Sequence, residues 1–399
     1  MNKPELLAPA GSFEKLQAAL RYGADAVYLA GDGFGLRVRA SNFGYDQMDE
    51  AFKYLRERDK KGYVTVNAFL KNGELDGVRD YIGTLNDIKP DALIISDPGV
   101  FKIAREVAPN IPVHISTQAN VTNLSAVDFW HSLGAERVIL AREVTGEETE
   151  YICKNSKCEV EVFVHGAMCI SMSGRCLISN YMTGRDANAG DCAQSCRWNY
   201  ALMEQTRDGQ YFPVEEDARG TYFYNSKDLC LLEHVEKLTK MGVKSLKIEG
   251  RMKSVMYVSV VAGVYRNAID AAMKGDYKVS DEWWKQLRGI SHREYTEASY
   301  EGQAGADSMN YGTSSYVRGI EFLAVVEGDH EDGVEILSKA KFAPGEKILV
   351  LSPDMNEVEV TAGELIDMKN GFSEPNTKPG MRYILKGLKA PEGSLIRRY

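Results

Sequence analysis

The sequence of 399 residues has a formal net charge of −9 at pH 7, with 44% hydrophobic and 26% charged residues. This balance is that of an ordinary globular protein and excludes a disordered or low-complexity chain. No stretch approaches the roughly 20 apolar residues that span a bilayer, and the start of the chain has no apolar core of signal-peptide length. We therefore expect a soluble, cytoplasmic protein with no membrane partner.

Short apolar runs alternate with helical stretches along the first 250 residues. Their near-continuous Val, Ile and Leu content is typical of parallel strands that are covered on both faces. The predicted strands are residues 5–11, 26–31, 64–69, 92–96, 113–117, 138–141, 160–166 and 245–250. Eight strand–helix units predict an α/β fold, a (β/α)8 barrel of the TIM type, with a cysteine-rich insertion after strand seven. A doubly wound open sheet is the alternative, since a strand count does not show closure.

In such a barrel, chemistry collects at the C-terminal ends of the strands. Each polar residue expected there also has a structural interpretation. Asn67 and Gln118 could fill the barrel, and Asp97 could cap the next helix. Arg142 and Glu143 could pair with each other, and His165 could be a hydrogen-bonded structural residue. As a set, these residues predict a polar pocket for an anionic small molecule. The set comprises Asn67, Asp97, Gln118, Arg142, Glu143, His165, Glu249 and Arg251, with Pro9 beside them.

The insertion holds four of the seven cysteines: Cys169, Cys176, Cys192 and Cys196. In a reducing cytosol, clustered cysteines are more often metal ligands or redox thiols than disulfides. The segment contains no C-x-x-C pair, which disfavours a structural zinc ribbon, whereas four thiolates are the usual complement of a cubane iron–sulfur cluster. We rank iron–sulfur first, zinc second and a redox thiol pair third. Cys230 is expected on an apolar helix as a core cysteine, and it is the reserve ligand in place of Cys196.

After about residue 315 the pattern changes to short β-rich runs broken by Gly, Pro, Asn and Asp, which predicts a small all-β barrel or sandwich. We expect a barrel catalytic domain at 1–275 with a cluster-binding insertion at 166–225, a linker at 276–317 and a C-terminal β-barrel domain at 318–399. The last domain could present substrate. The alternative is a stabilising or dimerising appendage.

Basic residues gather in two segments of this acidic chain. Residues 374–399 carry six basic residues against two glutamates, a local charge of +4: Lys378, Arg382, Lys386, Lys389, Arg397 and Arg398 against Glu374 and Glu392. Residues 243–253 carry Lys244, Lys247, Arg251 and Lys253 against Glu249. Either segment alone is read as solvated surface. A nucleic-acid footprint would need the two to share a face.

Three long motifs carry a resemblance to a known family: "ELLAPAGSFEKLQAALRYGADAVYLA", "VFVHGAMCISMSGRCLISNYMTGRDANAGDCAQSCRW" and "KSLKIEGRMKSVMYV". Together they resemble the collagenase-like peptidase family U32, over the barrel and, more loosely, the C-terminal module. Characterised relatives include oxygen-independent hydroxylases of transfer-RNA wobble uridine or of a ribosomal-RNA cytidine, and proteins of anaerobic ubiquinone synthesis. The resemblance implies a [4Fe–4S] cluster bound by Cys169, Cys176, Cys192 and Cys196.

The length and the appended module resemble the transfer-RNA branch more than the short ubiquinone proteins. The resemblance therefore implies an enzyme that forms 5-hydroxyuridine in a transfer RNA, with prephenate as an anionic co-substrate. In that interpretation the catalytic candidates are Asn67, Gln118, His165, Glu249 and Arg251. Arg142 and Lys253 are the substrate-binding candidates, which hold carboxylates or phosphate, and the basic C-terminal end contacts the RNA backbone. A homo-oligomer, or a hetero-oligomer with a shorter family member, is compatible with this interpretation.

Two other functions stay open at this point. The first is the hydrolysis that the family name implies, although none of the six histidines stands in an H-E-x-x-H motif and no G-x-S-x-G elbow is present. A Cys/His protease built on His165 and Cys169 would place its nucleophile among three other cysteines, which would be unusual. The second is a non-catalytic iron–sulfur RNA-binding factor.

Overall fold

The computed structural model describes residues 2–35, 42–168, 173, 178–185, 191–195, 202–203, 211–212, 215–217, 220–222, 225–302, 309–310, 317 and 319–399. Of the four clustered cysteines, Cys192 falls within these ranges, whereas Cys169, Cys176 and Cys196 lie outside the described residues. Within these ranges, no helix combines the length and the apolar character that crossing a membrane requires.

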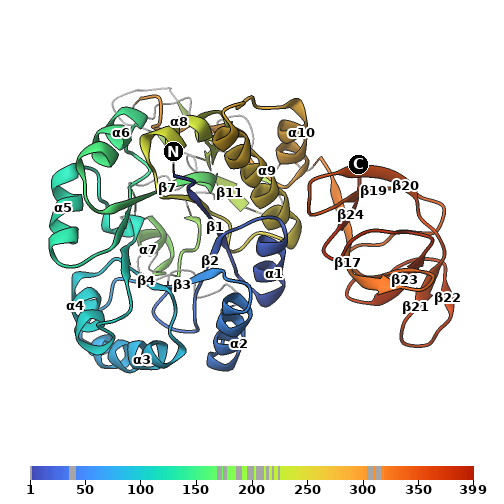
Figure 1. The fold of residues 1–399 in the computed structure, drawn as a ribbon, viewed down its shortest axis with the longest axis horizontal. Helices are drawn as coiled ribbons and strands as arrows, with labels where there is room; N and C mark the ends of the chain where they lie inside the picture. Colours follow the sequence, from blue (N-terminus) through green and yellow to red (C-terminus); the bar gives the residue numbers. More distant parts are fainter. Residues whose placement is uncertain are drawn as a thin grey trace.

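Eight parallel strands form a closed barrel at the centre of the larger domain (Figure 1). Each strand pairs with the next along the chain, and the last of them, β14, pairs with both β7 and β1. The alternative of an open sheet is therefore wrong, and the predicted barrel is confirmed. The strands are β1 (Glu5–Pro9), β2 (Ala26–Leu29), β3 (Lys61–Val66), β4 (Ala92–Ile95), β5 (Val113–Ile115), β6 (Arg137–Ile139), β7 (Glu159–Ala167) and β14 (Ser245–Ile248).

A ring of helices covers the outside of the barrel (Figure 1). At the start of several of these helices, a polar side chain accepts hydrogen bonds from N–H groups of the first turn, as Ser12, Asn123 and Ser254 do. Asp97 caps α4 in this way by accepting from the backbone of Gly99 and Val100, which confirms its structural interpretation. The helices are α1 (Phe13–Arg21), α2 (Tyr45–Arg56), α3 (Leu75–Ile88), α4 (Pro98–Val107), α5 (Leu124–Ser132), α6 (Gly146–Asn155), α8 (Val235–Met241) and α9 (Val255–Lys274), with 3-10 turns at Asn72–Glu74, Thr117–Ala119 and Leu232–His234.

The segment after β7 contains short elements: α7 (Ile178–Thr183), β8 (Leu202–Met203), β9 (Tyr211–Phe212), β10 (Glu215–Asp217), β11 (Gly220–Tyr222), β12 (Asn225–Ser226) and β13 (Asp228–Cys230). β13 pairs antiparallel with the end of β7, which places Cys230 opposite His165. The prediction of a helix at Cys230 is therefore wrong, because pairing with β7 gives these three residues their hydrogen bonds. The prediction of a core cysteine is confirmed, since Cys230 is buried.

The stretch predicted as a linker contains structure that packs on the barrel. Ser280 caps α10 (Asp281–Gly289), which contacts α9. β15 (Tyr295–Thr296) follows and pairs with β13, and β16 (Met309–Asn310) pairs with β12. The chain from α10 to β15 thus extends the barrel domain past residue 276.

The C-terminal domain is all β, as predicted, and has its own apolar core. Its eight strands are antiparallel in the order β20-β19-β24-β17-β18-β23-β21-β22. Among the described residues, the edge strands β20 and β22 do not pair with each other, so the sheet is a half-barrel. The strands are β17 (Glu321–His330), β18 (Gly333–Ser338), β19 (Lys347–Leu351), β20 (Glu357–Thr361), β21 (Leu365–Asp367), β22 (Ser373–Glu374), β23 (Arg382–Lys386) and β24 (Leu395–Arg398).

The C-terminal domain packs against the barrel wall beside α1, α9 and α10 (Figure 1). The hydroxyl of Tyr22, on the barrel side, donates to the carbonyl oxygens of Leu351 and Gly393 at 3.0 and 3.1 Å. Buried Arg397 of β24 donates to the Gln286 side chain of α10 at 2.9 Å. These buried polar contacts fix the position of one domain against the other.

Candidate active site

Side chains from non-adjacent strands meet at the carboxyl ends of the barrel. Arg251, after β14, donates to the hydroxyl of Thr65 on β3 at 3.3 Å. The amide of Asn67, at the end of β3, lies 3.4 Å from the hydroxyl of Ser116, which follows β5. Since β3 neighbours neither β14 nor β5, these contacts cross the mouth of the barrel. Gln118 lies on the 3-10 turn that follows Ser116. The mouth therefore brings Asn67, Gln118 and Arg251 to one region.

Arg142 and Glu143, after β6, bind the chain that leaves β7. The Arg142 guanidinium stacks over the ring of Phe163 at 4.3 Å and donates to the carbonyl of Ala167 at 3.0 Å. The Glu143 carboxylate accepts from both the backbone N–H and the hydroxyl of Ser173, each at 2.9 Å. The alternative in which Arg142 and Glu143 pair with each other is not what the described residues show. Both side chains instead anchor the start of the insertion.

His165 is 1% exposed and is surrounded by the rings of Tyr257, Tyr265 and Tyr295, whose centroids lie 5.9, 5.5 and 5.3 Å away. The hydroxyl of Tyr265 donates to the carbonyl of Val164 at 2.7 Å and lies 3.4 Å from Nδ1 of His165. Because the tyrosine proton is engaged, we assign the imidazole proton to Nδ1. Burial lowers the pKa of His165 to about 3, so this imidazole is neutral at pH 7. It can accept a hydrogen bond at Nε2, but it cannot hold an anion by charge.

Glu249 and Lys253 lie between the mouth and the second domain. The backbone N–H of Glu249 donates to the carbonyl of His165 at 2.8 Å, which ties the ends of β14 and β7 together. Lys253 donates to the carbonyl of Ser291 at 3.2 Å and lies 4.0 Å from the carboxylate of Asp228.

Asp228 is shared between two cations, because Arg293 also binds it at 2.8 Å. Although burial opposes the charge of Asp228, Arg293 and Lys253 lower the pKa of this carboxyl group. The group of Asp228, Arg293 and Lys253 therefore carries one net positive charge beside the mouth.

Comparison with known proteins identifies the family of this chain. The model described as peptidase family U32 matches residues 11–310, and the model of the U32 C-terminal domain matches residues 318–397. The chain belongs to peptidase family U32. This confirms the resemblance carried by the three sequence motifs.

Proteins similar to this U32 chain are named for several different functions. It is 39% identical to tRNA hydroxylation protein P1 of Bacillus subtilis over 370 residues, which is 92% of this chain and 87% of that protein. It is 35% identical over 273 residues to the 23S rRNA 5-hydroxycytidine synthase of Escherichia coli, covering 68% of this chain and 40% of that protein. It is also 32% identical over 357 residues to a collagenase of Porphyromonas gingivalis, covering 84% of each.

Two cysteines of the U32 chain can be compared as candidate ligands. Cys192 is exposed, and its sulfur accepts a hydrogen bond from the backbone N–H of Gln194 at 3.3 Å. Cys230 is buried with its sulfur 3.7 Å from the Tyr265 hydroxyl, and burial raises the pKa of its thiol to about 12. Metal ligation requires a thiolate, and burial disfavours the thiolate of Cys230. The exposed Cys192 is therefore the better suited of these two cysteines to bind a metal.

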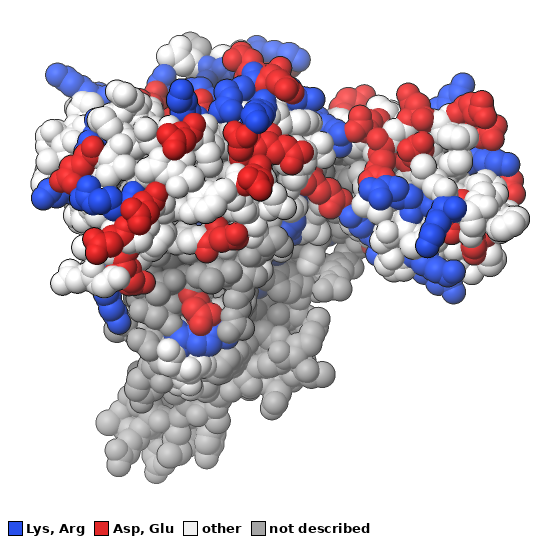
Figure 2. Space-filling view, turned by 90° about the horizontal axis from the view of Figure 1, so that it is seen from below, with Lys and Arg blue, Asp and Glu red and all other residues white. Residues whose placement is uncertain are grey.

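The two basic segments do not form one basic face. In segment 243–253, Lys247 is buried in the barrel, 2.9 Å from Glu161, and Arg251 is buried at the mouth. Four of the six basic side chains of the C-terminal end are in ion pairs: Arg382 with Glu327, Lys386 with Glu364, Arg397 with Glu357, and Arg398 with Glu321 and Glu346. These residues therefore do not form the shared basic face that a nucleic-acid footprint would need. Figure 2 shows cationic and anionic side chains intermixed on the C-terminal domain.

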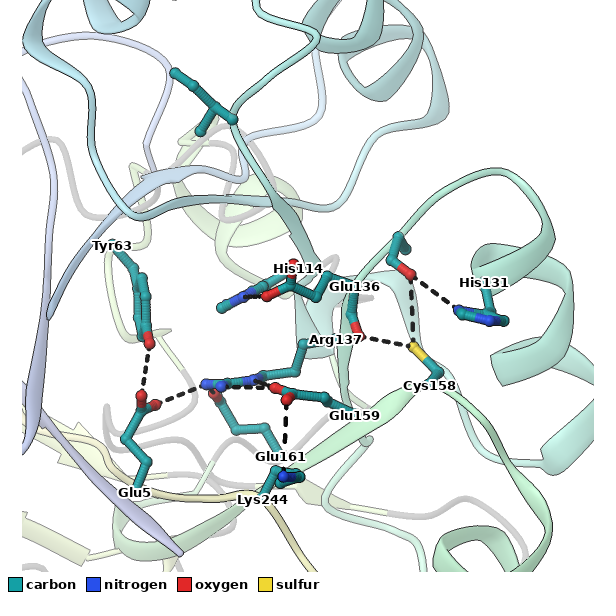
Figure 3. A network of polar contacts seen from close by, with 12 residues as sticks. Glu5, Tyr63, His114, His131, Glu136, Arg137, Cys158, Glu159, Glu161 and Lys244 are labelled. Atoms are coloured by element: carbon teal, nitrogen blue, oxygen red, sulfur yellow. Dashed lines mark hydrogen bonds and ion pairs between the residues drawn. The ribbon is translucent and has the colours of Figure 1, made fainter.

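Sequence reasoning missed an ionic network inside the barrel (Figure 3). Arg137, the first residue of β6, binds Glu5 of β1 at 2.7 Å and Glu161 of β7 at 3.2 Å. Tyr63 of β3 donates to the same Glu5 at 2.6 Å. These strands are not all neighbours, so the contacts cross the barrel interior. Glu5 and Arg137 begin their strands, which places the network at the end opposite the mouth, where a role in stability is expected.

Proposed function

We propose that this U32 chain is an RNA-modifying enzyme of the cytoplasm that hydroxylates C5 of the wobble uridine of a transfer RNA, without dioxygen and with prephenate as co-substrate. The observation that carries the proposal is the similarity to a tRNA hydroxylation protein over 92% of this chain, which extends across both domains. The ribosomal-RNA relative supports the same reaction class, hydroxylation of a pyrimidine.

A [4Fe–4S] cluster is part of the proposal. Cys169, Cys176, Cys192 and Cys196 would hold it, and when bound it would supply one-electron redox chemistry. The exposed sulfur of Cys192, with the backbone N–H of Gln194 donating to it, fits a thiolate ligand.

The side chains at the mouth suit the binding of an anionic co-substrate. The Arg251 guanidinium is held in place by Thr65, and a guanidinium with a fixed orientation binds carboxylates with little loss of conformational freedom. Asn67 lies on the same side of the mouth and can donate a further hydrogen bond from its amide. Lys253 adds positive charge on the side that faces the second domain.

The test is nucleoside mass spectrometry of transfer RNA from a deletion strain, complemented with the wild-type gene or with the Cys192→Ser variant. Loss of 5-hydroxyuridine on deletion, restored by the wild type but not by the variant, is the expected result. Iron and sulfide analysis of the anaerobically purified proteins should show about four of each per chain in the wild type only. Unchanged 5-hydroxyuridine, together with cleavage of collagen by the purified protein, would instead support the peptidase function.

A further inference from the structure

A cleft of about 800 Å³ lies between the mouth of the barrel and the C-terminal domain. Its barrel side includes Glu249 and Lys253, and its other side includes Phe322 and Tyr399. Gln194 of the cysteine-rich insertion also reaches it. Figure 2 shows a recess where the two domains meet. The cleft therefore joins three parts of the chain: the strand ends that carry the candidate catalytic residues, the insertion and the second domain.

Large apolar side chains are exposed in this cleft. Met252 is 51% exposed and Tyr399 is 69% exposed, and both line it together with Phe322. Flat aromatic and thioether surfaces of this kind give an unpaired base a face on which to stack.

One cationic side chain of the cleft, Lys253, is placed where it can contact a phosphate group of a ligand. Lys253 belongs to the group with Asp228 and Arg293 that has one net positive charge. The carboxylate of Glu321, which also lines the cleft, is bound by Arg398 at 2.7 Å. Glu249 lines the end nearest the mouth, where a carboxylate can accept hydrogen bonds from the N–H or hydroxyl groups of a nucleoside.

The volume favours a ligand larger than a small dicarboxylate. Ligand pockets usually have volumes of about 300–1,000 Å³, and this cleft lies toward the upper end of that range. The residues of β17 that line the cleft, Glu321 and Phe322, pair with Arg398 and Arg397 of β24. On that side, β17 offers no free strand edge to which an extended peptide could add.

We propose that this cleft is the binding site for an unpaired pyrimidine nucleotide of the RNA substrate. The base stacks on Met252 and Tyr399, the adjoining phosphate lies near Lys253, and the nucleotide is thereby directed toward Glu249 and the mouth. The inference rests on the proposed function, because it takes RNA as the substrate.

Photocrosslinking of the full-length protein tests the site directly. The probe is an anticodon stem–loop RNA that carries 5-iodouridine at the wobble position. Mass spectrometry of the crosslinked peptides should identify Met252, Phe322 or Tyr399. Crosslinks found only elsewhere, for example at the exposed Phe372 of the same domain, would overturn the proposal.

Binding measurements on variants give an independent readout. Tyr399→Ala and Met252→Ala should each weaken binding of this RNA about tenfold, the loss expected for one stacked base. Lys253→Gln should reduce the slope of log Kd against log salt concentration by about 1, the change expected when one phosphate contact is lost. The control is Phe372→Ala, which removes an aromatic side chain that is 71% exposed and lies outside the cleft. It should bind RNA like the wild type. Equal affinities for all four variants would contradict the proposal.

These results separate the two proposals. If the deletion strain loses 5-hydroxyuridine but the crosslinks and variants do not involve the cleft, the binding site is wrong and the function stands. If the strain keeps 5-hydroxyuridine and the protein binds a collagen peptide in place of RNA, both are overturned.

Discussion

Arg251 is oriented at the mouth before any ligand binds. Its guanidinium donates to Thr65, and its backbone oxygen lies so close to Gly11 that a Cβ there would approach it to 2.2 Å. Such fixed donors stabilise charge without the cost of reorganising when the ligand arrives. The position of this side chain is thus determined by strands β3 and β14 and by the turn after β1.

We expect Arg251→Lys to lower kcat/KM for RNA hydroxylation roughly 10- to 100-fold, since one charge-assisted hydrogen bond contributes about 1.5–3 kcal/mol. A lysine keeps the charge but not the planar pair of donors. Thr65→Val, which removes only the acceptor that orients the guanidinium, should have a smaller effect. Steady-state kinetics with varied co-substrate measure both. A kcat/KM for Arg251→Lys within twofold of wild type would show that Arg251 does not bind the reacting anion.

His165 makes the stability of the barrel depend on pH. Its pKa is about 3 in the folded protein and about 6.5 when unfolded, so the unfolded chain binds the extra proton. The stabilising contribution is complete above pH 6.5 and is lost as the pH falls toward 3. At pH 4.5 the loss is on the order of 2–3 kcal/mol.

Replacing His165 by Asn should therefore reduce the loss of unfolding free energy between pH 7 and pH 4.5 by about this amount. Urea unfolding at the two pH values gives the difference for each protein. His131→Asn, at an exposed position, is the control and should lose as much stability on acidification as the wild type. If the two variants respond equally to pH, His165 is not held neutral by burial.

The strands of the barrel show which features a sequence pattern can predict. Continuous apolar runs located all eight parallel strands, and the strand ends located Asn67 and Arg251 at one mouth. β13 could not be predicted, because its three residues form a strand through pairing with β7 and β15, which lie far from it in the sequence. The inward charges Glu161 and Lys247 lie within apolar runs, and their pairing depends on which strands face each other across the closed barrel. The capped helix α10 did carry a local signal, in Ser280 and the apolar spacing after it.

The ionic network at the amino ends of the strands leads to a prediction about stability. Arg137→Met would leave Glu5, Glu159 and Glu161 without their shared cation. Removing one partner of a buried ion pair destabilises the folded protein by about 3–5 kcal/mol, because the other charge stays buried without compensation. We expect the free energy of unfolding, measured in urea, to fall by about this amount. Arg79→Met, which removes an exposed ion pair with Glu106, should leave it almost unchanged. A similar small effect of both substitutions would contradict a structural role for the network.

In the whole molecule, the C-terminal domain contacts the barrel domain at helix α9. Nearly all of α9 is buried, because the barrel lies on one side of it and the C-terminal domain on the other. Gly263 stands at the closest point, where an added Cβ would lie 2.2 Å from the sulfur of Met355 and 3.2 Å from the ring of Tyr22. Gly263 therefore leaves room for the Met355 side chain of the C-terminal domain, which a larger residue at this position would have to displace.

We expect Gly263→Leu to separate the domains. A helix position usually gains up to about 1 kcal/mol when Gly is replaced by a better helix former, so loss of docking would come from the clash and not from the helix. Small-angle scattering should show a larger radius of gyration. RNA hydroxylation should fall as well, because both domains line the cleft. Gly83→Ala in α3 is the matched control, since its Cβ would meet only Val107 at 3.9 Å. Unchanged scattering and activity for Gly263→Leu would show that the second domain need not be held against the barrel for the reaction.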